Sequence, residues 1–180
     1  VKRILGFSRS ESTDKEAQDL KDVVSDAVVL LRSTIPSTIN IDERTEDVGT
    51  VVMDRAQIQT VVLNLASNAA HAIEGKPGNL GIRLSQVQFD EPFVAQNTIL
   101  TPGDYAKLSV SDDGSGIDPV KLERIFDPFF TTKAVGEGTG LGLSMVHGII
   151  GKHDGAITVS STVGRGTTFE IYLPVAHQTT

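Results

Sequence analysis

The sequence contains neither cysteine nor tryptophan among its 180 residues. Without cysteine it has no disulfide bond and no thiolate metal site, which fits a reducing cytoplasm, and we expect a cytoplasmic location. No apolar run approaches the ~20 residues that span a bilayer, so we expect no direct membrane contact from this chain, although upstream segments of a longer protein can supply an anchor. Basic residues are also few, 16 against 23 acidic ones, and the net charge of −7 argues against a nucleic-acid partner.

The chain is long enough to form one hydrophobic core. Its residues are 39% hydrophobic, and a chain of this size buries roughly 70% of its unfolded surface in a single core. We therefore expect one domain over residues 16–176, with short appendages at 1–15 and 177–180.

Hydrophobic periodicity predicts helices over 20–35, 54–73 and 140–152, and a short helix over 119–126. The helix at 54–73 is apolar nearly all round, which indicates that it is buried. Within strand 80–89 the apolar pattern shifts phase by one residue, since Leu80, Ile82 and Leu84 are followed by Val87 and Phe89. Helices and mostly antiparallel strands around one core predict an α+β fold, a two-layer α/β sandwich. The other predicted segments are strands at 39–44, 51–53, 105–110, 156–161 and 168–173, a linker at 8–19, a hairpin connection at 90–104 and a glycine-rich loop at 131–139.

The helix predicted over 54–73 carries three polar residues on one face. Asn64, Asn68 and His71 are spaced i, i+4 and i+7, so their side chains stack on one side of the helix. A buried amide costs free energy unless its hydrogen bonds are satisfied. Either the two amides tie down neighbouring loops, or this face looks into a polar ligand, with an amide oxygen available to a hard cation such as Mg²⁺.

An acidic turn containing glycine follows directly after a predicted strand, with the sequence Asp112-Asp113-Gly114-Ser115-Gly116-Ile117. Glycines at alternate positions allow positive φ angles and the close approach of a flat group. A carboxylate at the end of a strand can accept a hydrogen bond from an exocyclic amine. Taken alone, the segment also fits an ordinary acidic turn, and it lacks the further acidic ligands of a calcium loop.

A glycine-rich loop, Gly136-Glu137-Gly138-Thr139-Gly140-Leu141-Gly142, leads into the helix predicted over 140–152. The N-terminus of that helix offers free N–H groups and a positive dipole end to phosphate. The loop is not a Walker A motif, and its spacing does not fit the dinucleotide-binding fingerprint. Lys133, at the edge of the loop, is a candidate phosphate contact. Three nearby phenylalanines are predicted to form local core: Phe126, Phe129 and Phe130.

Together these segments resemble, in order, the N, G1, F and G2 boxes of the catalytic domain of bacterial-type sensor histidine kinases, within the superfamily that includes gyrase, Hsp90 and MutL. The boxes correspond to residues 63–69, 112–117, 126–130 and 138–143, and residues 164–169 resemble the last hairpin of the family. The resemblance covers about residues 20–175. It implies a Bergerat-type ATP-binding fold, in which a mixed, mostly antiparallel sheet packs against helices.

The resemblance also implies residue roles. Asp112 would accept a hydrogen bond from the adenine amine, with Thr167 nearby. Asn68 would ligate the Mg²⁺ that bridges the phosphates, supported by Asn64, and residues 131–141 would form an ATP lid. The implied catalytic residues are Asn64, Asn68 and Lys133, and the other implied nucleotide contacts are His71, Gly114, Gly116, Ile117, Phe130, Gly138, Thr139, Gly140, Leu141, Gly142 and Leu143. Many relatives carry an aromatic ring directly after the position of His71, where this chain has Ala72, so we expect a modest affinity.

The implied function is transfer of the γ-phosphoryl group of Mg-ATP to a histidine in two-component signal transduction. The partners would be a dimerisation domain that carries the phosphoacceptor histidine and, downstream, the receiver domain of a response regulator. Residues 1–15 would be the tail of the dimerisation helix and a linker, with the acceptor upstream. Among the four histidines only His153 precedes an acidic residue, and its place at a helix end predicts a structural role.

Two alternatives remain: an ATP-hydrolysing machine of the same superfamily, and a nucleotide-sensing module with no catalytic output. In the hydrolases, the general base is typically a Glu four residues before the magnesium-binding Asn. Here that position is Asn64. A neutral amide cannot take a proton from water, which favours transfer to an outside nucleophile.

Overall fold

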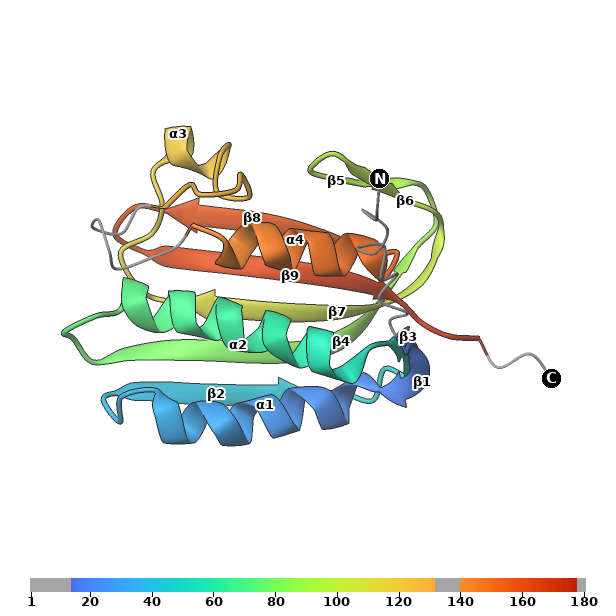
Figure 1. Ribbon diagram of the computed structural model, residues 1–180, viewed down its shortest axis with the longest axis horizontal. Helices are drawn as coiled ribbons and strands as arrows, with labels where there is room; N and C mark the ends of the chain where they lie inside the picture. Colours follow the sequence, from blue (N-terminus) through green and yellow to red (C-terminus); the bar gives the residue numbers. More distant parts are fainter. Residues whose placement is uncertain (1–13, 132–139, 178–180) are drawn as a thin grey trace, which may run out of the picture.

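A five-stranded mixed sheet forms one layer of the protein, and helices cover one of its faces (Figure 1). The computed structural model describes residues 14–131 and 140–177. Helices α1 (Leu20–Thr34), α2 (Arg55–Ala72) and α4 (Gly142–Lys152) lie side by side on the covered face. Across the sheet the strands are β2 (Ile39–Thr45), β4 (Gly78–Phe89), β7 (Gly103–Asp112), β9 (Gly166–Pro174) and β8 (Ala156–Thr162). Among the described strands of this sheet, β2 and β4 pair in parallel and the other neighbours pair antiparallel. The sheet and its covering layer of helices confirm the predicted α+β two-layer sandwich.

Smaller elements correct two of the predicted segments. The end of the predicted linker is strand β1 (Glu16–Asp19), which pairs antiparallel with β3 (Thr50–Met53). Its side chains do not alternate between apolar and polar, and the strand is defined by backbone pairing instead. The predicted short helix ends early, as α3 (Pro119–Leu122), followed by turns. No helix in the described ranges is long and apolar enough to cross a bilayer.

The main core lies between the sheet and the helices. Helix α1 begins after Asp19, whose side chain accepts the Lys21 N–H at 2.8 Å, and α2 begins after Asp54, whose side chain accepts the Gln57 N–H at 3.2 Å. Both contacts are N-caps that satisfy backbone donors of the first turn. Apolar residues at helical spacing then face the sheet, and the fully buried members include Leu20, Val24, Ile58, Val62 and Leu65.

Strand β4 changes the face on which its apolar side chains lie. Leu80, Ile82 and Leu84 belong to the core under the helices, whereas Val87 and Phe89 join a second cluster on the opposite face. The ladder with β7 continues without interruption, so the phase shift in the sequence is not a bulge. A hairpin of β5 (Phe93–Ala95) and β6 (Thr98–Leu100) contributes to that cluster, and the rings of Phe89 and Phe93 stack 4.3 Å apart.

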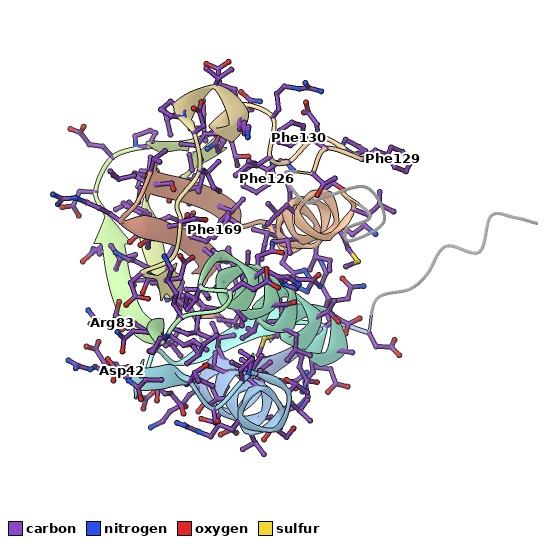
Figure 2. All side chains as sticks on the ribbon, turned by 90° about the vertical axis from the view of Figure 1, so that its left-hand side faces the viewer. Asp42, Arg83, Phe126, Phe129, Phe130 and Phe169 are labelled. Atoms are coloured by element: carbon purple, nitrogen blue, oxygen red, sulfur yellow. The ribbon has the colours of Figure 1, made fainter. Side chains whose placement is uncertain are left out.

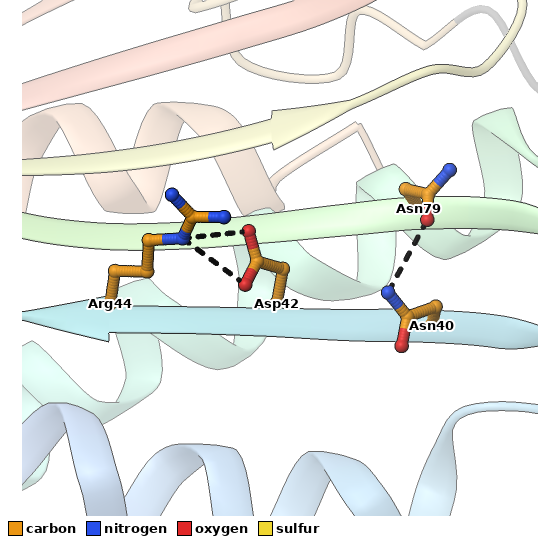
Figure 3. A network of polar contacts seen from close by, with 4 residues as sticks. All are labelled: Asn40, Asp42, Arg44 and Asn79. Atoms are coloured by element: carbon orange, nitrogen blue, oxygen red, sulfur yellow. Dashed lines mark hydrogen bonds and ion pairs between the residues drawn. The ribbon is translucent and has the colours of Figure 1, made fainter.

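Elsewhere the face away from the helices is polar. Asp42 and Arg83 project from it (Figure 2). Asp42 forms an ion pair with Arg44 at 3.2 Å, and Asn40 donates to the side chain of Asn79 at 3.3 Å (Figure 3). These contacts are exposed, and pairs of this kind add little to stability. The sheet therefore has one buried face and one largely hydrated face.

Candidate functional site

A cleft of about 500 Å³ opens between α2, the start of α4 and the turn that follows β7. This volume lies within the range of small-ligand sites. Most of the predicted site residues that the structure describes line the cleft: Asn64, Asn68, His71, Asp112, Gly116, Ile117, Phe130, Gly140, Gly142, Leu143 and Thr167. Gly114 lies in the same turn as Gly116, and Leu141 directly precedes α4. Lys133, Gly138 and Thr139 lie outside the described residues, as do residues 1–13 of the predicted helix tail and linker.

The polar face of α2 points into the cleft rather than toward loops. The Asn64 amide donates to the Thr60 carbonyl of its own helix at 2.9 Å, and Nδ1 of His71 lies 2.8 Å from the Ser67 carbonyl. Asn68 is half-buried and makes no hydrogen bond to any residue in the described ranges. The amides therefore do not tie down neighbouring loops, and the Asn68 side chain is available to a ligand in the cleft.

The turn after β7 is held tightly by backbone contacts. The Ser115 N–H donates to the Ala72 carbonyl at the end of α2 at 2.9 Å, and its carbonyl accepts the Gly164 N–H at 2.7 Å. Gly116 has a φ of 72°, and a Cβ there would lie 2.3 Å from the Thr162 carbonyl oxygen. Glycine is thus required at 116 by conformation and by space together. The turn forms a fixed wall of the cleft between α2 and the β8–β9 hairpin.

Two adjacent carboxylates in this turn have opposite environments. Asp112 lines the cleft, and burial raises the pKa of its carboxyl, although hydrogen bonds from the backbone N–H groups of Gly114 and Thr167 partly offset that effect. Asp113 is exposed and accepts both the backbone N–H and the side-chain amide of Asn79, each at 2.8 Å, which lowers its pKa. Asp113 therefore anchors β4, while Asp112 presents an acceptor to the cleft.

The phenylalanines after α3 do not all belong to the core. Phe126 packs edge-on against Phe169 at 6.4 Å, and Phe130 lines the cleft with the Arg124 guanidinium 4.9 Å from its ring centroid. Phe129, in contrast, is 76% exposed and points away from both (Figure 2). Its φ of 65° is rare for a residue with a side chain and turns the ring outward. The prediction of local core is thus wrong for Phe129.

Ser161, near the end of β8, was not predicted as a site residue. Its hydroxyl accepts the Ile117 N–H at 2.7 Å and lies 2.8 Å from the hydroxyl of Thr167. A serine late in a predicted strand has no feature that distinguishes it from a solvated one. Only the pairing of β8 with β9 brings it next to the cleft.

Residues 14–131 and 140–177 contain no group of three or more His, Asp or Glu side chains that could hold a metal ion. These residues therefore provide no metal site made of such side chains alone. A cation in the cleft would share the Asn68 amide oxygen with oxygens of a bound ligand. Such a mixed coordination suits Mg²⁺, which usually keeps few protein ligands and takes the rest from phosphates and water.

The chain is similar in sequence to a family model and to sensor kinases. Residues 53–177 match the family model described as "Histidine kinase-, DNA gyrase B-, and HSP90-like ATPase". Sensor kinase CckA of Brucella abortus is 42% identical over 176 residues, which cover 97% of this chain and 18% of that protein. Signal transduction histidine-protein kinase AtoS of Escherichia coli K12 is 33% identical over 180 residues, 99% of this chain and 27% of that protein. The chain thus spans only about a fifth to a quarter of these relatives.

Two solved structures of histidine kinases have a similar fold over most of the length of this chain. The mycobacterial sensor histidine kinase MprB has a TM-score of 0.70 at 28% identity, covering 89% of this chain and 97% of that one. A nucleotide-free catalytic domain of histidine kinase ThkA has a TM-score of 0.69 at 30% identity, covering 89% and 95%.

Proposed function

This chain belongs to the histidine kinase-, DNA gyrase B- and HSP90-like ATPase family, and we propose that it binds Mg-ATP and transfers the γ-phosphoryl group to a histidine on a dimerisation domain. The proposal rests on the arrangement of the cleft. A half-buried acceptor, Asp112, lies in one wall, and a half-buried amide without a described partner, Asn68, lies in another. Asn64 is a neutral amide where a hydrolase needs a base.

The adenine would bind at Asp112. A carboxylate accepts the exocyclic amine of adenine, and it repels the carbonyl oxygen that guanine carries at the same position. Thr167, which is 4% exposed, lies beside this carboxylate. Ala72 lines the cleft without offering a ring to stack on the base, so the affinity is expected to be modest.

The phosphates would lie between α2 and α4. The first turn of α4, at Gly142 and Leu143, lines the cleft, and a helix N-terminus favours bound phosphate. Asn68 would hold the Mg²⁺, and His71 and Lys133 would face the phosphates. When bound, Mg²⁺ neutralises charge that develops on the transferred group and on the leaving oxygen.

The reaction would be an in-line displacement at the γ-phosphorus. An imidazole nitrogen of the acceptor forms the new P–N bond, the bond to the β–γ bridging oxygen breaks, and ADP leaves with that electron pair. This chain would contribute positioning and charge. Downstream, the phosphoryl group would pass to the receiver domain of a response regulator.

Nucleotide binding is tested first, by thermal melting with ADP and Mg²⁺. Nucleotide at about a hundredfold above its Kd stabilises the native state by about 2.7 kcal/mol. For a chain of this size, the melting temperature should rise by about 5 to 10 °C. A melt unchanged at millimolar nucleotide would disprove the assignment.

Phosphotransfer is tested by mixing the chain with γ-labelled ATP and a separate histidine-bearing dimerisation domain from a sensor histidine kinase. Labelling of the added domain is expected, but weak, because a tether that raises the effective concentration is absent from the mixture. Asn68→Ala should abolish it, whereas Asn40→Ala, on the outer sheet face, should not. A chain that binds nucleotide normally and labels nothing would instead be a nucleotide-sensing module.

A further inference from the structure

Three side chains form a row across adjacent strands at the wall of the cleft. Asp112 on β7 is the register partner of Thr167 on β9, and Thr167 is the register partner of Ser161 on β8. The Asp112 carboxylate accepts the Gly114 N–H at 2.9 Å, and the hydroxyls of Thr167 and Ser161 lie 2.8 Å apart. The row thus places two hydroxyl groups, those of Thr167 and Ser161, beside the Asp112 carboxylate.

The contacts of Ser161 limit how these hydroxyls can be oriented. Its oxygen accepts the Ile117 N–H at 2.7 Å, which uses one of its two lone pairs, and it has one proton to donate. That proton can go to the Gly166 carbonyl, at 3.1 Å, or to the Thr167 hydroxyl, at 2.8 Å. Ser161 can therefore act toward Thr167 only as an acceptor in the first arrangement and as a donor in the second.

Each arrangement gives Thr167 a different chemical character toward the cleft. If Ser161 donates to Gly166, Thr167 must donate to Ser161, and it offers only lone pairs to a ligand. If Ser161 donates to Thr167, the Thr167 proton is free to point into the cleft. The second arrangement fits an acceptor atom on the ligand, and the first fits a donor.

We propose that Ser161 is a positioning residue for base recognition, which orients the Thr167 hydroxyl as a donor toward the N1 atom of adenine. This inference rests on the proposed binding of adenine nucleotide. In adenine, the N1 acceptor is adjacent to the carbon that bears the amine, so a base whose amine reaches Asp112 can present N1 to Thr167 on the neighbouring strand. The contact is direct or passes through one water. Ser161 would thereby complete a donor–acceptor pattern that matches adenine.

The test compares the affinities of ADP and of 1-deaza-ADP, in which a C–H group replaces N1. Isothermal titration gives both Kd values for the unmodified chain and for Ser161→Ala, Ser161→Thr and Thr167→Val. Ser161→Ala should weaken ADP binding about tenfold, the usual effect of one lost hydrogen bond, and should change 1-deaza-ADP binding little. Ser161→Thr keeps the hydroxyl and should retain the preference for ADP, whereas Thr167→Val should lose it. Ser160→Ala, on the opposite face of β8, is the matched control.

Equal weakening of both ligands by Ser161→Ala would overturn the inference, because it would show that Ser161 only holds the turn through Ile117. In 7-deaza-ADP a C–H group replaces N7, and its Kd is measured as well. If Ser161→Ala weakens ADP and 1-deaza-ADP but leaves 7-deaza-ADP unchanged, the contact is to N7 and the assignment to N1 is overturned. If the unmodified chain binds neither nucleotide, the proposed function itself fails, and that result is distinct from either of these.

Discussion

The Nε2 atom of His153, just after α4, accepts a hydrogen bond from the backbone N–H of Asp54, just before α2, at 3.0 Å. Its Nδ1 atom lies 2.7 Å from the Ile149 carbonyl, so the contacts fit a neutral ring that carries its proton on Nδ1. The side chain is 3% exposed, which confirms the predicted structural role. His153 thus joins α2 and α4 at the ends opposite the cleft, whose walls these two helices form.

We predict that His153→Ala lowers the free energy of unfolding by about 3 kcal/mol. The change leaves the Asp54 N–H without its partner, removes the side-chain contact to the Ile149 carbonyl and opens a cavity. His177→Ala, at an exposed position near the C-terminus, serves as the control and should change the free energy by less than about 0.5 kcal/mol. Urea denaturation measures both. A cost below about 1 kcal/mol for His153→Ala would mean that the two helices do not depend on this contact.

The carboxylates of Asp112 and Asp113 should affect the free energy of unfolding in opposite directions. The folded-state pKa of Asp112 is raised above its ordinary value of 3.8, so the folded state holds this proton more tightly and stability falls as pH rises through that window. Asp112→Asn should therefore raise the free energy of unfolding of the nucleotide-free chain at pH 7. The pKa of Asp113 is lowered, so its stabilisation is present above 3.8 and is lost as pH falls through the lowered value. Asp113→Asn should then be destabilising at pH 7.

Urea unfolding from pH 3 to pH 8 measures the free energy of unfolding of each variant relative to the unmodified chain. The difference should be positive for Asp112→Asn and negative for Asp113→Asn at pH 7, and both differences should become smaller toward pH 3. Asp112→Asn should also remove most of the ADP-induced rise in melting temperature, because an amide offers a donor to the adenine amine. A variant that is less stable at pH 7 and still binds ADP would show that Asp112 is structural.

Much of the site could be predicted because the N box lies within α2 and the G1 box covers the end of β7 and the turn directly after it. The spacing of Asn64, Asn68 and His71 already fixes their common helix face, and the turn at 112–117 follows one strand. Ser161 and strand β1 escaped prediction because their roles depend on pairing with distant strands. Local periodicity carries no information about such partners.

The phase shift of the apolar residues in β4 shows a second limit of prediction from the sequence. The pattern from Leu80 to Phe89 indicates correctly that the buried face changes, but a bulge and a second covered face give the same sequence pattern. Only the uninterrupted ladder with β7 and the contacts with Phe93 identify the second explanation. The exposure of Phe129 could not be predicted either, because no local pattern indicates its positive φ.

Glycine-to-alanine changes should separate a required glycine from a dispensable one. At Gly116, a Cβ would lie 2.3 Å from the Thr162 carbonyl in a left-handed conformation, so Gly116→Ala should destabilise the chain by at least about 1 kcal/mol and reduce the ADP-induced shift. At Gly148, within α4, nothing lies within 4 Å of an added Cβ. Gly148→Ala should stabilise by up to about 1 kcal/mol and leave ADP binding unchanged. Thermal melts with and without ADP measure both effects, and similar results for the two variants would refute the close packing of the turn.

Finally, the chain alone should hydrolyse ATP very slowly. Asn64 occupies the position of a hydrolase base, and its amide nitrogen already donates to Thr60. A neutral amide takes no proton from water, and the lack of a positioned base typically costs about 10²–10⁴ in rate. Asn64→Glu would introduce a carboxylate and should raise phosphate release above that of Asn64→Gln, which has the same length and no charge. Phosphate release is measured for all three proteins at saturating Mg-ATP. Rapid turnover by the unmodified chain would contradict the kinase proposal, because it would require a base that the described part of the cleft does not contain at this position.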